Sequence, residues 1–292
     1  MRRNKIISVL SLPALVVLAV SCVKYRLSDT LHPDAGSVYV SFDWSGIGEG
    51  LDIPPEWTLN VGDRSYGLGG ENVTFNDYFP PGTYRISAYN RPENIWMDGS
   101  VATAVHVSGG DDAAEYITGS PGWLFSSVMD LEVEADREYE VVLDMVQQVR
   151  QLTIVLEFEG GTAPQVSAVK CSLSGAAGTL DLVTGEHGTP SSVMADFSKI
   201  TEGDDAGKWS CTVRLLGISG EPCKLAGTIF FDSGPDPMPL EGDLSEYLSG
   251  FNTGKEVPLV LKGLVKEVPT GAGFSGIVDG WESVEGGNVD AH

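Results

Sequence analysis

Cysteine and histidine are the residue types through which this chain could do covalent, acid–base or metal chemistry. It has four of each in 292 residues. No histidine has a second histidine, a cysteine or a carboxylate at the spacing of a zinc site. A Gly-x-Ser-x-Gly nucleophile turn, a phosphate-binding glycine loop and a dinucleotide fingerprint are also missing from the sequence. We therefore predict no catalytic residue, no metal site and no cofactor, and a protein that is not an enzyme.

Acidic side chains dominate the charge. The chain has 41 Asp and Glu against 18 Lys and Arg, which gives a formal net charge of −23. Phosphate groups are bound by clustered basic residues, so this balance excludes nucleic acid as a direct partner. Clustered acids such as Asp111-Asp112 and Asp204-Asp205 lie in Gly- and Ser-rich loops, and none has the alternating pattern of an EF-hand. We interpret them as solvated loop charge.

Cys22 is the cysteine whose position indicates a function. It follows a basic start and an apolar run from Ile6 to Val20, which is the layout of a secretory signal. The stretch Leu18-Ala-Val-Ser-Cys22 resembles a bacterial lipobox, in which the cysteine is acylated. We predict lipidation at Cys22, with a palmitate-type chain that anchors the protein to the outer membrane at the cell surface. The alternative is an ordinary signal peptide cleaved nearby.

The other three cysteines are typical of a protein interior. Cys171 shares a strand face with Val169 and Leu173, and Cys211 alternates with apolar residues in the same way. Cysteine at such positions acts as a small buried hydrophobe. We favour free thiols for these two and for Cys223, and a disulfide between two of the three is the alternative.

Aromatic residues offer the other candidate contacts. Trp96 and Trp123 lie in predicted loops, where an exposed ring could stack on a sugar. They are therefore candidate contacts for a host or bacterial surface glycan, and the alternative is that they belong to the core.

Short strands with alternating apolar residues must position all these side chains. Val38, Val40, Phe42 and Trp44 share one face of a predicted strand, and we name them as candidate strand-pairing residues. Similar strands follow at roughly ten-residue spacing, separated by Gly and Pro turns, which favours sandwiches over alternating strands and helices.

This pattern predicts an all-β protein of two tandem transthyretin-like β-sandwich domains, with one short helix after Asp243 in the second. The predicted divisions are a lipoprotein signal peptide (1–22), a tether (23–36), an N-terminal sandwich (37–147), a C-terminal sandwich (148–281) and a polar tail (282–292).

Several motifs resemble those of one family of fimbrial lipoproteins. They are Val40-Ser-Phe-Asp-Trp-Ser45, Phe79-Pro-Pro-Gly-Thr-Tyr-Arg-Ile-Ser-Ala-Tyr-Asn90, Pro121-Gly-Trp-Leu-Phe125, Gln147-Gln-Val-Arg-Gln-Leu152 and Met238-Pro-Leu. Together they are similar to the FimB-like minor subunits of Bacteroidales-type fimbriae, a family of cell-adhesion lipoproteins.

The resemblance implies a non-enzymatic anchor or accessory subunit that pairs strands with the fimbrial shaft or with other minor subunits. An anchor would keep its own first strand, here Val38–Trp44, and its lipid at Cys22. A surface glycan-binding module that uses Trp96 and Trp123 is the alternative function.

Overall fold

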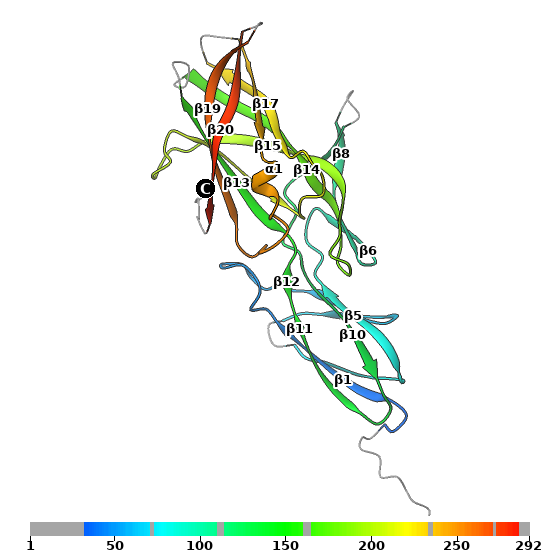
Figure 1. The fold of residues 1–292 in the computed structure, drawn as a ribbon. Coiled ribbons are helices and arrows are strands. Elements are labelled where there is room, and N and C mark those ends of the chain that lie inside the picture. The colour runs from blue at the N-terminus through cyan, green and yellow to red at the C-terminus, as the bar shows by residue number, and fades with distance from the viewer. Residues whose placement is uncertain are drawn as a thin grey trace, which may run out of the picture.

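The computed structural model describes residues 32–70, 73–109, 114–159, 165–232, 236–270 and 273–285. Within these ranges the chain is all-β apart from one helical turn, and it forms two units placed end to end (Figure 1). The predicted signal peptide with Cys22, most of the tether, the Asp111-Asp112 pair and the end of the tail lie outside the described residues.

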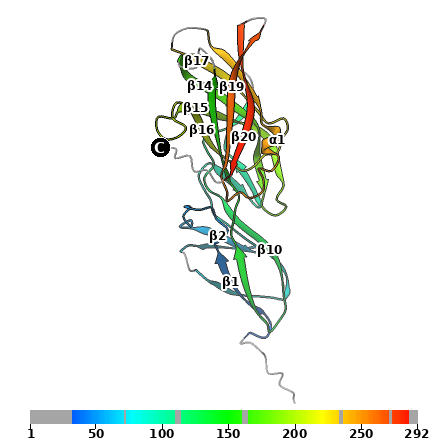
Figure 2. The same cartoon turned by 60° about the vertical axis from the view of Figure 1, so that its left-hand side comes forward.

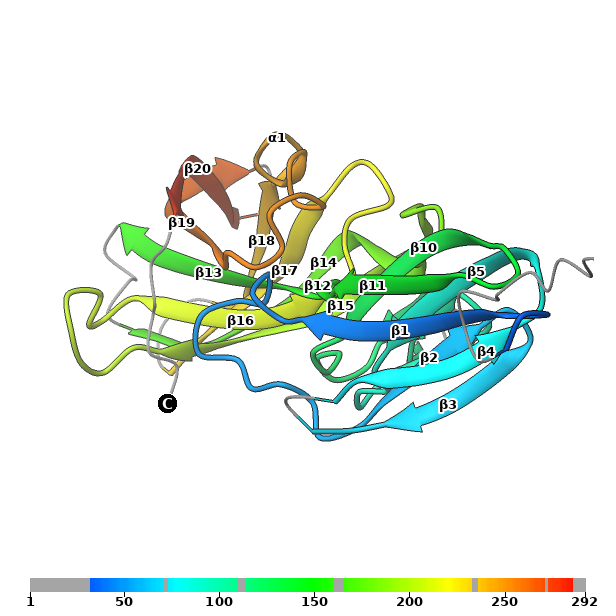
Figure 3. The same ribbon diagram turned by 90° about the horizontal axis from the view of Figure 1, so that it is seen from below.

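The N-terminal unit has two sheets around one apolar core. The three-stranded sheet has the order β11-β1-β4, and the five-stranded sheet has the order β12-β10-β5-β2-β3 (Figure 3). The strands are β1 (Gly36–Asp43), β2 (Trp57–Val61), β3 (Arg64–Leu68), β4 (Phe75–Phe79), β5 (Gly82–Tyr89), β10 (Phe125–Val133), β11 (Glu138–Asp144) and β12 (Val146–Gln147).

Strand β1 occupies the middle of the three-stranded sheet. It pairs in parallel with β11 on one side and antiparallel with β4 on the other. Val38 and Val40 are almost completely buried, Phe42 is half-buried, and Trp44 follows the strand and is 8% exposed. The apolar period of two therefore places one face of β1 in the core.

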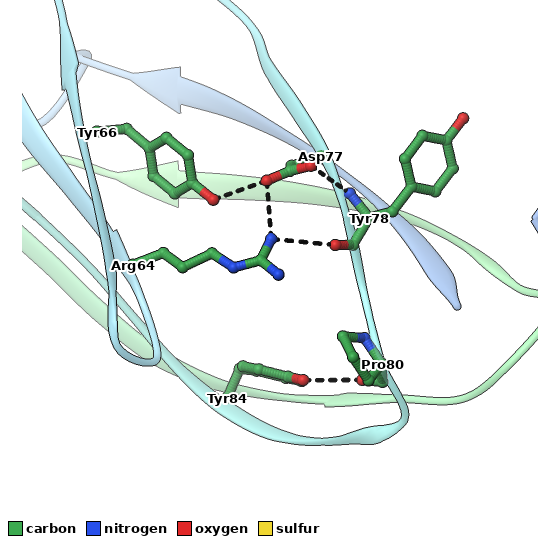
Figure 4. A network of polar contacts seen from close by, with 6 residues as sticks. All are labelled: Arg64, Tyr66, Asp77, Tyr78, Pro80 and Tyr84. Carbon is green, nitrogen blue, oxygen red and sulfur yellow. Dashed lines mark hydrogen bonds and ion pairs between the residues drawn. The ribbon is translucent and has the colours of Figure 1, made fainter. Parts of the chain in front are cut away.

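A polar cluster ties together the last strands of the two sheets, β3 and β4 (Figure 4). Asp77 Oδ2 accepts hydrogen bonds from Arg64 Nη1 at 3.0 Å and from the Tyr66 hydroxyl at 2.7 Å. The Arg64 guanidinium also lies 4.9 Å from the centre of the Phe79 ring. These contacts close the unit on the side where neither sheet has a further strand.

The C-terminal unit is a closed eight-stranded barrel. Its strands follow the order β14-β17-β18-β20-β19-β13-β16-β15, and β15 pairs back onto β14 to close the ring (Figure 2). The strands are β13 (Arg150–Glu159), β14 (Val166–Asp181), β15 (His187–Lys199), β16 (Trp209–Leu215), β17 (Lys224–Phe231), β18 (Met238–Asp243), β19 (Leu259–Thr270) and β20 (Gly273–Glu285).

The prediction of two tandem transthyretin-like sandwiches is therefore wrong, although the all-β content is right. Gly175 is one physical reason. A glycine at this position is typical of a turn between two short strands, but Gly175, with a φ of +82°, lies in a bulge within the single strand β14. A long, bent strand can pair along both edges and so close a sheet into a ring.

Two hairpins from the first half of the chain extend the barrel sheet. They comprise β6 (Ile95–Asp98) with β7 (Val101–Ala104), and β8 (His106–Gly109) with β9 (Ala114–Ile117). Strand β7 pairs with β14, and β9 pairs with β15. Both hairpins therefore hydrogen-bond to the C-terminal unit, and the division of the chain at residue 147 stays a prediction.

The helical turn α1 (Ser245–Leu248) lies where the sequence indicates a helix. The carboxylate of Asp243 accepts hydrogen bonds from the backbone N–H and the hydroxyl of Ser245, at 2.9 and 2.7 Å. Leu248 and Phe251 are buried in the barrel core, so the turn packs against it through its apolar side.

Candidate functional site

The predicted strand-pairing residues lie inside the N-terminal unit. Val38, Val40 and Trp44 belong to its buried core, and Phe42 packs against that core with its ring 5.4 Å from that of Trp57. Both sides of β1 are paired within the chain. A role of this strand in pairing with a partner stays a prediction.

The two candidate glycan residues occupy different environments. Trp96 projects from β6 and is 69% exposed. Trp123 is half-buried and packs against the cores of both units, with the Arg214 guanidinium 5.2 Å from its ring centre. Only Trp96 therefore presents a largely open ring, and the glycan role of both residues stays a prediction.

The cysteines in the described part of the chain are free and buried. Burial raises the pKa of the Cys171 and Cys211 thiols to about 12, so both stay protonated at neutral pH. Among the described residues no three His, Cys, Asp or Glu side chains are grouped to hold a metal ion. In that same part of the chain, no helix is long and apolar enough to cross a membrane.

The segment that joins the two units forms a buried polar network. Gln147 ends β12 and is 3% exposed. Its Oε1 accepts a hydrogen bond from Gly48 N at 2.9 Å, and its Nε2 donates to the carbonyls of Val149 and Lys255 at 2.8 Å. One amide side chain therefore binds backbone from both units at once.

Lys255 brings a charged group into the same junction and is 7% exposed. Its ammonium donates to the carbonyls of Gln148 and Leu216, both at 3.0 Å, and to His187 Nε2 at 3.1 Å. Burial lowers the pKa of Lys255 to about 8. Burial, and then the nearby ammonium, lower the pKa of His187 to about 4, so the ring is neutral and its Nε2 accepts a hydrogen bond from the ammonium.

Arg150 holds the loop that carries Lys255. Its Nε donates to the carbonyl of Val257 at 2.8 Å, and its Nη1 donates to those of Phe251 and Thr253 at 3.1 and 3.0 Å. The guanidinium also lies 5.3 Å from the Phe251 ring centre. The Gln147–Leu152 motif, which spans the predicted division at residue 147, thus carries contacts between the units that the sequence alone does not show.

Gln147→Ala tests this network. The substitution leaves a buried N–H and two carbonyls without their partner. We therefore expect the free energy of unfolding, measured in urea, to fall by about 2 kcal/mol. Gln148→Ala is the control, since Gln148 acts at the junction through its backbone carbonyl. Equal losses in the two variants would show that the Gln147 amide does not hold the units together.

A second feature is a groove where the barrel wall opens. Strands β15 and β16 are in register only at Ser198↔Ser210 and Lys199↔Trp209. Beyond these pairs the strands separate around a groove of about 530 Å³. Val193, Cys211 and Val213 line it, together with the exposed side chains of Val107 and Met194. The groove is apolar and borders a strand edge that β15 leaves unpaired.

The described residues thus define a two-unit, all-β protein with open strand edges and a polar junction. A family model for fimbrillin-A associated anchor proteins Mfa1 and Mfa2 matches residues 59–225, more than half of the chain. The chain therefore belongs to this family of fimbrial anchor proteins, and the resemblance seen in the sequence is confirmed. Membership implies a fimbrial accessory role in adhesion, at the cell surface or in the envelope.

Solved structures share the fold at low sequence identity. A candidate adhesin from Bacteroides ovatus is 15% identical with a TM-score of 0.56, over 74% of this chain and 84% of that one. The fimbrial anchor protein Mfa2 from Porphyromonas gingivalis is 13% identical with a TM-score of 0.54, over 85% of this chain and 97% of that one. No curated protein matches the sequence.

Proposed function

We propose that this protein is a non-enzymatic subunit that anchors or joins fimbriae at the outer membrane. The observation that carries the proposal is the family match, which runs from β2 in the N-terminal unit to β17 in the barrel. Its partners are the shaft subunit or other minor subunits, and its hold on the membrane is a lipid at Cys22. Two acyl chains bind a bilayer far more stably than one, so a doubly acylated cysteine suffices without a spanning segment.

Strand pairing is the proposed means of assembly. An extended segment from a partner can pair with an open sheet edge while its alternate side chains fill apolar pockets. The groove between β15 and β16 supports this, because β15 pairs with β16 only at Ser210 and Trp209 and the groove beyond is lined by Val193, Cys211 and Val213. Strand β1 keeps its own place in the N-terminal sheet, which suits a subunit that ends a polymer.

Two experiments in intact cells test the proposal: photo-crosslinking tests the strand pairing, and metabolic labelling tests the lipid anchor. A crosslinking amino acid placed at Met194, beside the groove, should join the protein to a terminal strand of a fimbrial subunit, identified by mass spectrometry of the linked peptides. Val142 is the matched control, since it is 59% exposed on the outer side of β11. Metabolic labelling with a palmitate analogue should be lost in Cys22→Ala.

Crosslinks at Val142 but not at Met194 would exclude the groove as the contact. A wild-type protein that takes up no label would exclude the lipid anchor.

A further inference from the structure

A pocket at the junction of the two units has a lining that indicates a ligand class. It has a volume of about 430 Å³, within the range of about 300–1,000 Å³ usual for small-ligand sites. One wall comes from the loop after β1, with Ile47, Glu49 and Leu51. The loop before β19 contributes Glu256 and Val257. Since both units contribute, the pocket exists only while the junction is closed.

Trp123 provides the aromatic part of the lining. The indole is half-buried, and its contacts with the cores of both units hold it in place. Gln147, which also lines the pocket, has both ends of its amide engaged with backbone groups. The walls are therefore pre-formed, and a ligand would meet apolar side chains, an indole and carboxylates.

Charge decides which ligand fits. Glu49 and Glu256 line the pocket, and no basic side chain is part of its lining. The Arg214 guanidinium lies outside this lining, 5.2 Å from the centre of the Trp123 ring. Neither carboxylate takes part in the ion pairs found among the described residues. The nearby Lys255 ammonium is directed to the carbonyls of Gln148 and Leu216. The two carboxylates attract a cation, and the apolar walls with the indole suit a methylene stem.

We propose that this pocket binds the side chain of a lysine or arginine from another molecule. The cationic end lies between Glu49 and Glu256, and its stem packs along Leu51, Val257 and the Trp123 indole. The inference does not rest on the fimbrial role, since it uses only the lining of the pocket. A sugar is the competing ligand class, because carboxylates can also accept hydrogen bonds from hydroxyl groups.

The test uses the full mature chain labelled with ¹⁵N-tryptophan, so that each indole N–H gives its own NMR signal. The probe is N-acetyl-arginine methylamide. We expect a saturable shift of the Trp123 signal with a dissociation constant on the order of 1 mM. The exposed Trp96 should not respond, and Trp123→Phe and Trp96→Phe assign the two signals.

Two controls isolate the charge. N-acetyl-citrulline methylamide has almost the same shape without the charge and should bind at least about fivefold more weakly. Glu49→Gln and Glu256→Gln should each weaken arginine binding by roughly threefold to fivefold. Glu140→Gln, at an exposed site on β11, changes the net charge equally and should have no effect.

The proposal is overturned if arginine gives no saturable shift, if citrulline binds equally well, or if Glu140→Gln weakens binding as much as the pocket variants. A Trp123 shift produced by methyl α-mannoside or methyl β-galactoside, but not by arginine, would overturn it in favour of a glycan site.

Discussion

Val40→Asp is expected to unfold the N-terminal unit while the barrel stays folded. Val40 is 1% exposed in the middle of β1, between its pairing partners Val141 on β11 and Phe75 on β4. A carboxylate at this position would lie in an apolar core without a cation, and an unpaired buried charge costs about 4 kcal/mol. The N-terminal unit has its own core, so its transition can separate from that of the barrel.

Fluorescence during urea unfolding can measure this effect, because Trp44 and Trp57 lie in the N-terminal core and Trp209 and Trp281 in the barrel core. Val142→Asp is the control on the adjacent strand, where the side chain is 59% exposed and should cost less than about 0.5 kcal/mol. If Val40→Asp leaves the unfolding transition of the N-terminal unit unchanged, β1 is not an integral strand of this unit.

The second large effect is a loss of stability in mild acid that depends on His187. The folded state holds the pKa of His187 at about 4, against 6.5 for an unperturbed histidine. Between these values the unfolded chain binds a proton that the folded chain does not, so stability falls as pH falls through this window. The loss in the free energy of unfolding is at most about 3 kcal/mol. Partial exposure of the His187 ring reduces the expected loss to about 2 kcal/mol.

The measurement is the free energy of unfolding at pH 7 and at pH 4.5, for the wild type and for His187→Gln. Glutamine cannot gain a proton, so the variant should lose about 2 kcal/mol less over this interval. Carboxylates titrate in both proteins, and the difference between them cancels that contribution. His106→Gln is the control, because it makes the same substitution at a histidine whose ring contacts a hydroxyl, that of Ser191 at 3.0 Å, in place of an ammonium. The same acid loss in wild type and His187→Gln would exclude the titration of the buried His187 ring as its cause.

Several features of the fold could be predicted because they depend on neighbours in sequence. The alternation of Val38 and Val40 with polar residues indicated a half-buried strand, and both side chains are in the core. The same reasoning placed Cys171 and Cys211 inside, where the structure has them as free thiols. The turn after Asp243 was recognised from its apolar spacing, although its N-cap is Leu244, without a side-chain hydrogen bond.

The junction and its pocket could not be predicted in this way. His187 stands in a Gly-Glu-His-Gly stretch that shows no partner, yet its ring meets Lys255, which is 68 residues further along the chain. Gln147 and Gly48 are 99 residues apart. No periodicity records such contacts, because they form only when the barrel places the loop before β19 against the end of β12.

The sequence by itself determined the strand content, the buried faces, the acidic surface and the fimbrial family, because composition, alternation and short motifs are local properties. Only the tertiary structure decided that the second set of strands closes into a barrel and where that barrel opens. Strands in a sandwich and in a barrel alternate alike, and their difference lies in which edges pair. That choice depends on bulges such as the one at Gly175 and on contacts between distant strands.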